Sequence, residues 1–233
     1  VLLNEADEKG EICIDTETTS LNPHETNLVG LSLSIKVGHA YYIPLGHKEG
    51  QNLNEKEVLK ILKPTLEDPS IKKIGQNIKF DFIVLFKRGI EMNSMEDTML
   101  MSYVLDAGKN RHNMDTLSKI HLDHSPISFK DLVGTGKKQI NFSDVKIEEA
   151  KNYAAEDADI TYRLYKNFIN NLKSEKLLNI YEIFEKPLIK ILSMMEINGV
   201  KIDEKFLKKL SKKFQNKIED LEKSIFKISG KNF

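Results

Sequence analysis

Asp15 and Glu17 are the first residues along the chain whose types and spacing could do chemistry together. They lie in the run Glu11–Glu17, which mixes Ile, Cys and acids after a turn-like Glu-Lys-Gly and is typical of a strand. Alternate residues of a strand point to the same face, so the two carboxylates should project side by side. Adjacent carboxylates raise each other's pKa unless a cation lies between them. The pair is therefore either a set of cation ligands or a solvated strand end.

Two more pairs of polar residues are spaced as neighbours on a helix. Asn77 and Asp81 are four residues apart, and so are Tyr153 and Asp157. Residues at this spacing lie one above the other on a helical face. Each pair also has an ordinary interpretation. Asn77 could be an N-cap beside a solvated Asp81, and Tyr153 and Asp157 could belong to a helix with an acidic face.

Taken together, the four carboxylates suit a pair of divalent cations. They are Asp15, Glu17, Asp81 and Asp157. Carboxylates are hard oxygen ligands, which Mg²⁺ and Mn²⁺ prefer. Two cations about 4 Å apart can clamp the attacking and leaving oxygens of an in-line phosphoryl displacement. The hydroxyl of Tyr153 could hold the attacking water, so the combination predicts hydrolysis of nucleic acid.

The elements that carry these residues indicate an α/β fold with a mixed sheet. Strand patterns occur at Glu11–Glu17, Leu28–Ile35, His39–Pro44 and Lys72–Gly75. Helical patterns occur at Asn54–Leu66, Asn77–Lys87, Glu96–Leu105, Met114–His121, Ile147–Leu172, Leu177–Asn198 and Asp203–Ile228. The segment Ser125–Val145 is rich in loops. Three strands followed by a helix, a strand and further helices are typical of an α/β domain.

A break in the chain is expected at one of two places, near residues 174–178 or near Asn198-Gly199. We place the boundary at the first of them. Residues 1–175 then form one compact domain, and residues 176–233 form a helical extension. A chain of 233 residues is long enough for this division.

The charges exclude a simple charge-driven binder of nucleic acid. Lys plus Arg and Asp plus Glu are 35 each in the 233 residues, so the formal net charge is zero. Residues 201–233 hold ten Lys and five acids, whereas residues 1–200 hold 25 basic and 30 acidic groups. An acidic body repels phosphates, so binding of nucleic acid there should depend on divalent cations.

Cys13 is the single cysteine, which excludes an intramolecular disulfide and suits a reducing, cytoplasmic setting. It should share a strand face with Asp15 and Glu17, and we interpret it as core filler because the proposed cations prefer oxygen. No apolar run reaches the 18 or more residues of a membrane span, and no signal peptide opens the chain. We therefore expect no membrane partner.

Three motifs resemble those of a known family. Asp15–Leu21 (DTETTSL), Gly75–Asp81 (GQNIKFD) and Tyr153–Asp159 (YAAEDAD) are similar to the motifs of the 3′–5′ proofreading exonuclease domain of bacterial DNA polymerase I. The resemblance implies a ribonuclease-H-like fold with a mixed five-stranded sheet. Further similar segments cover nearly the whole chain: Leu62–Asp68, Arg111–Leu117, Glu185–Leu188 and Glu196–Asp203. The last stretch resembles the truncated beginning of a polymerase domain.

The resemblance also implies roles for the catalytic residues. Asp15, Glu17 and Asp157 would hold the metal that binds the attacking water. Asp15 would also touch a second metal, which Asp81 reaches through water. Tyr153 and Glu17 would orient the nucleophile. Mg²⁺ is the expected cation, with Mn²⁺ or Zn²⁺ as alternatives.

The resemblance further implies contacts to a single-stranded 3′ end. The apolar side chains of Leu21 and Phe129 would pack against the last bases, which is a sequence-tolerant way to hold a strand. Ordinary packing is the alternative for both. Contacts to the terminal nucleotide, its phosphates and the 3′ end are implied for Gln76, Asn77, Arg111, Thr16 and Thr18. A surface ion pair is the alternative for Arg111.

The implied activity is removal of nucleoside monophosphates from single-stranded or frayed DNA 3′ ends, in replication and repair, with the polymerase domain of the same parent chain as a partner. A catalytically silent scaffold is one alternative, and the four intact acids argue against it. A ribonuclease D-like RNA exonuclease is another. The segment Glu196–Asp203 and the Lys-rich last helix argue against that one.

Overall fold

The computed structural model describes residues 2–231, which divide into two compact units. The first unit reaches to Ile197 and holds the sheet and its covering helices. The second begins at Asn198 and holds the helix α10 (Glu204–Ser229), whose first turn is capped by the Asp203 carboxylate at 2.9 Å from the Phe206 amide. Within the described residues, no helix is both long and apolar enough to cross a membrane.

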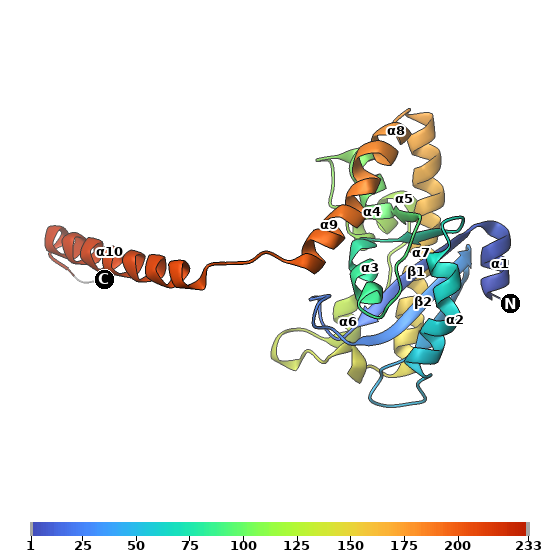
Figure 1. Cartoon of the computed structure of the whole chain (residues 1–233), viewed down its shortest axis with the longest axis horizontal. Coiled ribbons are helices and arrows are strands. Elements are labelled where there is room, and N and C mark those ends of the chain that lie inside the picture. Colours follow the sequence, from blue (N-terminus) through green and yellow to red (C-terminus); the bar gives the residue numbers. More distant parts are fainter. Residues whose placement is uncertain (1, 232–233) are drawn as a thin grey trace. The chain divides into compact units, whose positions relative to one another are not determined.

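The first unit is built on a mixed five-stranded sheet in the order β3-β2-β1-β4-β5. The strands are β1 (Glu11–Thr18), β2 (Leu28–Lys36), β3 (His39–Pro44), β4 (Lys72–Gly75) and β5 (Met95–Asp97). β1 is central, antiparallel to β2 and parallel to β4. Figure 1 shows β2 beside β1. The predicted α/β class with a mixed five-stranded sheet is confirmed.

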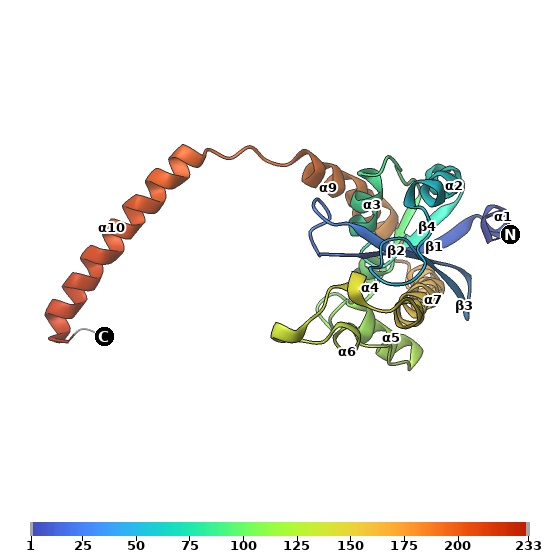
Figure 2. The same cartoon turned by 90° about the horizontal axis from the view of Figure 1, so that it is seen from below.

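Helices cover both faces of the sheet. α2 (Glu55–Glu67) and α3 (Lys79–Phe86) lie on one face, and α4 (Thr98–Asp106), α5 (Met114–Leu122) and α7 (Ile147–Ser174) lie on the other (Figure 2). The remaining helical elements of this unit are α1 (Leu2–Lys9), α6 (Phe129–Val133), η1 (Gly136–Lys138), η2 (Phe142–Asp144), α8 (Leu178–Ile180), η3 (Tyr181–Glu185) and α9 (Lys186–Asn198). The sequence patterns do not predict α1, β5 or α6.

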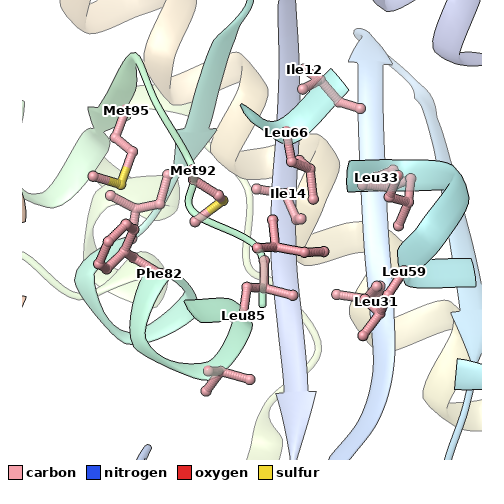
Figure 3. Packing of buried hydrophobic residues seen from close by; sticks show 14 of the residues in the cluster. Ile12, Ile14, Leu31, Leu33, Leu59, Leu66, Phe82, Leu85, Met92 and Met95 are labelled. Carbon is pink, nitrogen blue, oxygen red and sulfur yellow. The ribbon is translucent and has the colours of Figure 1, made fainter. Parts of the chain in front are cut away.

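The alternation of residues along β1 divides the core into two layers. Ile12 and Ile14 pack with side chains of β2, α2 and α3 (Figure 3). Cys13 faces the opposite way and packs among residues of α7. Burial of one such aliphatic side chain stabilises the fold by about 1.5–3 kcal/mol, so the strand is held on both faces. Its α7 face continues to Asp15 and Glu17 at the end of the strand.

The helix predicted at Asn77–Lys87 begins later, at Lys79. Asn77 has a left-handed backbone with φ +58°, and its amide donates to the Asp97 carboxylate at 3.0 Å. The prediction that Asn77 and Asp81 share one helical face is therefore wrong. A contact with a residue twenty positions along the chain makes this segment a turn.

The helix predicted from Glu96 also begins later, at Thr98. Met95–Asp97 pairs with β4 instead, with Gly75 opposite Asp97. The Asp97 carboxylate then accepts from the Met99 amide at 2.9 Å and caps α4. Such a cap satisfies one of the free amides of the first helical turn.

The segment after α7 is helical from Leu178 to Asn198, close to the helix predicted at Leu177–Asn198. A π-helical turn at Tyr181–Glu185 joins α8 to α9 within this run, and Tyr181 and Ile189 are buried in the first unit. The compact unit thus extends past the expected boundary at residue 175 to Ile197, close to the second place considered for a break. Assignment of residues 176–233 to the start of a polymerase domain stays a prediction. The division into compact units shows which residues pack together and does not show which kind of domain they belong to.

Candidate active site

Three carboxylates from two elements converge at the end of β1. Asp15 and Glu17 come from β1 and Asp157 from α7, and each offers an oxygen within 4.8 Å of the others. Small side chains allow this approach. Ala154 and Ala158 are fully buried one turn apart on α7, where α7 packs on the sheet. The predicted convergence of β1 with the late helix is therefore present in the fold.

Asp81 lies beside this cluster and is held by Thr16. Its Oδ1 accepts from the Thr16 amide at 2.9 Å and from the Thr16 hydroxyl at 2.6 Å. The Asp81 side chain is buried, with 3% of its surface exposed. The fourth predicted carboxylate is thus next to the other three, although it is not within their 4.8 Å group. Thr16 contacts Asp81 with both its hydrogen-bond donors.

The electrostatics of the cluster favour a bound cation. Burial raises the pKa of Asp15 to about 6. Burial, followed by repulsion from neighbouring carboxylates, raises the pKa of Glu17, Asp81 and Asp157 well above their ordinary values. A cation between such groups offsets both costs. Because all the donors are hard oxygens, the site fits a divalent cation such as Mg²⁺.

The raised pKa values predict how pH changes stability without metal. An Asp of ordinary pKa 3.8 that titrates near 6 when folded keeps its proton longer in the folded state than in the unfolded state. The contribution of the Asp15 carboxyl to the free energy of unfolding is fully present below the unfolded pKa of 3.8. It is lost as pH rises from 3.8 to about 6. We therefore expect Mg²⁺ to raise the thermal midpoint by about 5 °C near pH 7.5.

Thermal unfolding with EDTA or Mg²⁺, at about pH 5 and pH 7.5, measures this effect. The variant Glu17→Gln is the control, since it removes one buried charge and should reduce both the pH dependence and the response to Mg²⁺. An equal response of Glu17→Gln and the unchanged protein to Mg²⁺ would contradict the assignment of the effect to the cluster.

Tyr153 supplies a hydroxyl at the edge of the carboxylates. It donates to Asp157, one turn along α7. Burial, followed by the charges of Asp157, Glu17 and Asp15, raises the pKa of Tyr153 well above its ordinary value of 10.0. The hydroxyl therefore keeps its proton and remains a hydrogen-bond donor at neutral pH. Its ring lies 6.0 Å from that of Phe129, centroid to centroid.

The carboxylates lie in a cavity of about 520 Å³. Its lining includes all but one of the predicted site residues: Asp15, Thr16, Glu17, Thr18, Leu21, Gln76, Asn77, Asp81, Phe129, Tyr153 and Asp157. Leu21 is 94% exposed and Phe129 is 43% exposed, so both offer apolar surface to a ligand. The exception is Arg111, which is exposed and lies outside the lining.

Some polar groups of the predicted substrate contacts are already bonded within the protein. The Gln76 amide nitrogen donates to the His112 carbonyl at 2.8 Å, and its oxygen accepts from the Thr98 hydroxyl. The Thr18 hydroxyl donates to the Ser20 carbonyl at 3.0 Å. Gln76 and Thr18 therefore lie at the edge of the cavity with hydrogen-bond partners within the protein.

Several lining residues were not predicted from the sequence: Phe80, Met114, Gln139, Ile140, Asn141 and Phe142. The Phe142 ring lies parallel to Phe129 with 6.4 Å between centroids, and the two rings form an apolar wall. Phe142 lies in the segment Ser125–Val145, which the sequence identifies only as loop-rich. Loops often carry binding residues, but this general tendency does not single out Phe142.

Comparison with known proteins identifies similar chains. Residues 1–173 match a family described as 3′–5′ exonuclease. DNA polymerase I of Rhizobium leguminosarum is 40% identical over 96% of this chain and 24% of its own length. DNA polymerase I of Pseudomonas aeruginosa is 38% identical over 99% of this chain and 26% of its own length. The chain thus spans about a quarter of the length of these relatives.

Solved structures share the fold. The POL domain of Pol1 from M. smegmatis, in complex with DNA primer-template and dNTP, superposes with a TM-score of 0.72 at 19% identity, over 95% of this chain and 34% of that one. Brucella melitensis NrnC with bound Mg²⁺ gives a TM-score of 0.62 at 24% identity, over 83% of this chain and 89% of that one. The mixed sheet with its helices is consistent with the expected ribonuclease-H-like fold.

Proposed function

We propose that this chain, which belongs to the 3′–5′ exonuclease family represented in DNA polymerase I, hydrolyses the terminal phosphodiester at the 3′ end of single-stranded or frayed DNA. The relatives are about four times as long, so we also propose that the chain acts as the proofreading part of a longer polymerase, in replication and repair. The proposed partners are the DNA 3′ end and the polymerase domain of the same parent chain.

One observation carries the proposal. Oxygens of Asp15, Glu17 and Asp157 lie within 4.8 Å of one another in a cavity with apolar walls. A structural role does not account for this arrangement, because buried like charges destabilise a fold. The convergence therefore supports a catalytic domain over a silent scaffold.

The donor set supports two divalent cations, with Mg²⁺ first and Mn²⁺ or Zn²⁺ as alternatives. Asp15, Glu17 and Asp157 would hold one, and Asp15 with Asp81 would hold the other. When bound, such cations polarise the phosphodiester and make water more acidic. Thr16 fixes the Asp81 carboxylate through two hydrogen bonds, so that this ligand is oriented in advance.

Tyr153 and Glu17 would orient the attacking water. The Tyr153 hydroxyl stays protonated, because its pKa is raised by burial and by nearby carboxylates. Its bond to Asp157 fixes the ring beside the cluster. A carboxylate oxygen of Glu17 can accept a hydrogen bond from the same water. Correct placement of a nucleophile of this kind can account for several kcal/mol of the barrier, roughly 7–11 in favourable cases.

The cavity walls suit the last bases of a single strand. Leu21 and Phe129 present exposed apolar surface, and the Phe142 ring lies parallel to that of Phe129 in the same wall. Contacts of this type are tolerant of base identity, as proofreading requires. Thr16, Thr18, Gln76 and Asn77 would border the terminal nucleotide. Arg111 would contact a phosphate from outside the cavity lining.

A 5′-labelled single-stranded DNA, incubated with the chain and Mg²⁺, tests the proposal. We expect a ladder of products shortened one nucleotide at a time from the 3′ end, and EDTA should abolish it. An RNA strand of the same sequence separates this activity from that of an RNA exonuclease. Absence of 3′ shortening with both Mg²⁺ and Mn²⁺, or faster shortening of the RNA, would overturn the proposal.

A further inference from the structure

We propose that Tyr181, which follows the main helix α7 and lies outside the cavity, is a positioning residue of the nuclease site. Through Asp97, its hydroxyl would hold the turn Gln76–Ile78 at the cavity edge. This inference rests on the proposed function, because it assigns a task to that turn in holding the strand.

The turn needs an external support. Asn77 adopts φ +58°, a left-handed conformation that costs free energy for a residue other than glycine. The Asp97 carboxylate supplies the support. It accepts from the Asn77 amide at 3.0 Å and from the Ile78 amide at 3.1 Å, and it also accepts from Met99 at 2.9 Å. Asp97 is 1% exposed, so these bonds are shielded from water.

Asp97 in turn depends on Tyr181. The Tyr181 hydroxyl accepts from the Asp97 amide at 3.0 Å and donates to Oε2 of Glu96 at 2.9 Å. Oε1 of Glu96 accepts from Lys186 at 2.6 Å. Tyr181 is fully buried, so its hydroxyl has no water to replace either partner.

The strand that carries Glu96 and Asp97 is weak by itself. β5 has three residues and pairs only with β4, at the edge of the sheet. A strand this short contributes few ladder hydrogen bonds, so its end depends on side-chain contacts. Tyr181 opens the π-helical turn η3, and such turns are frequent at functional sites.

Tyr162 provides a matched comparison in the same hydrophobic cluster. Its hydroxyl donates to Oε1 of Glu11 at 2.6 Å, and Lys166 donates to the same oxygen. The chemistry therefore repeats that of Tyr181, Glu96 and Lys186. Glu11, however, begins β1, whereas the cavity lies at the other end of that strand.

Hydrogen exchange of the chain, without metal or DNA, tests the inference directly. We expect Tyr181→Phe to speed exchange of the Asn77 and Ile78 amides by about tenfold, because a buried hydrogen-bonded pair is lost. Tyr162→Phe should leave these two amides unchanged. Asp97→Asn, which cannot accept from both amides, should reproduce the effect of Tyr181→Phe and serves in its place if that variant does not fold.

Steady-state cleavage of single-stranded DNA completes the test. We expect Tyr181→Phe to raise KM by about tenfold with a smaller change in kcat, whereas Tyr162→Phe changes neither beyond about twofold. Equal exchange of Asn77 and Ile78 in Tyr181→Phe and the unchanged protein, or equal effects of the two Phe variants, would overturn the inference. Hydrogen exchange can be measured whether or not the protein cleaves DNA. If the unchanged protein were inactive, that result would refute the proposed function, and the exchange measurement would still test the role of Tyr181.

Discussion

Replacement of Asp157 by Asn lowers the rate of 3′-end cleavage by at least about 1000-fold, while the fold is retained. Asp157 is one of three carboxylates whose oxygens lie within 4.8 Å, and an amide is a poor ligand for a hard cation. Burial and repulsion from Asp15 raise the pKa of Asp157, which means that its charged form destabilises the fold when no metal is bound. The neutral amide of Asn removes this destabilising charge. We therefore expect a thermal midpoint in EDTA equal to or above that of the unchanged protein.

Asp159→Asn is the matched control for this substitution. Asp159 is buried on the same helix, but it pairs with Arg163 at 2.5 Å and accepts from the Gly38 amide. Its replacement should reduce stability and leave cleavage within about threefold of the original rate. Full activity of Asp157→Asn, measured on the labelled strand with Mg²⁺, would exclude Asp157 from catalysis.

The parts of the site that follow from local periodicity could be predicted from the sequence. The alternation of a strand places Asp15 and Glu17 on one face, and the helical turn places Tyr153 above Asp157. Both rules depend on neighbours two to four residues away. That the two elements meet was predicted from the chemistry of the combined carboxylates and from the resemblance to a known family, because spacing alone does not bring α7 to β1.

The remaining features depend on contacts between distant segments. Asn77 is part of a turn, and not of a helix, because Asp97 binds its amide. Phe142 reaches Phe129 across a loop. Tyr181 is buried in the first unit although it follows the expected boundary. In each case the partner is at least ten residues away, and no periodic pattern encodes such a pairing.

The same carboxylates should make the binding of DNA depend on divalent cations. Asp15, Glu17, Asp81 and Asp157 concentrate negative charge in the cavity that would hold a phosphate under the proposed function. Two unit charges 4 Å apart repel by about 1 kcal/mol in water and by several times more near a protein surface. We expect Ca²⁺, used to test binding apart from cleavage, to tighten binding of a single-stranded oligonucleotide at least about tenfold over EDTA near pH 8. Fluorescence anisotropy measures this difference.

Replacement of carboxylates by neutral amides should make the binding of DNA less dependent on divalent cations. The double variant Asp15→Asn, Glu17→Gln should not cleave, yet in EDTA it should bind the strand more tightly than the unchanged protein does, because part of the repulsion is gone. Lower pH should act in the same direction, since burial raises the pKa of Asp15 to about 6 and its proton returns near that value. K⁺ at matched ionic strength controls for general screening. If K⁺ tightens binding as much as Ca²⁺ does, or the double variant binds more weakly in EDTA, then the carboxylates do not govern entry of the strand.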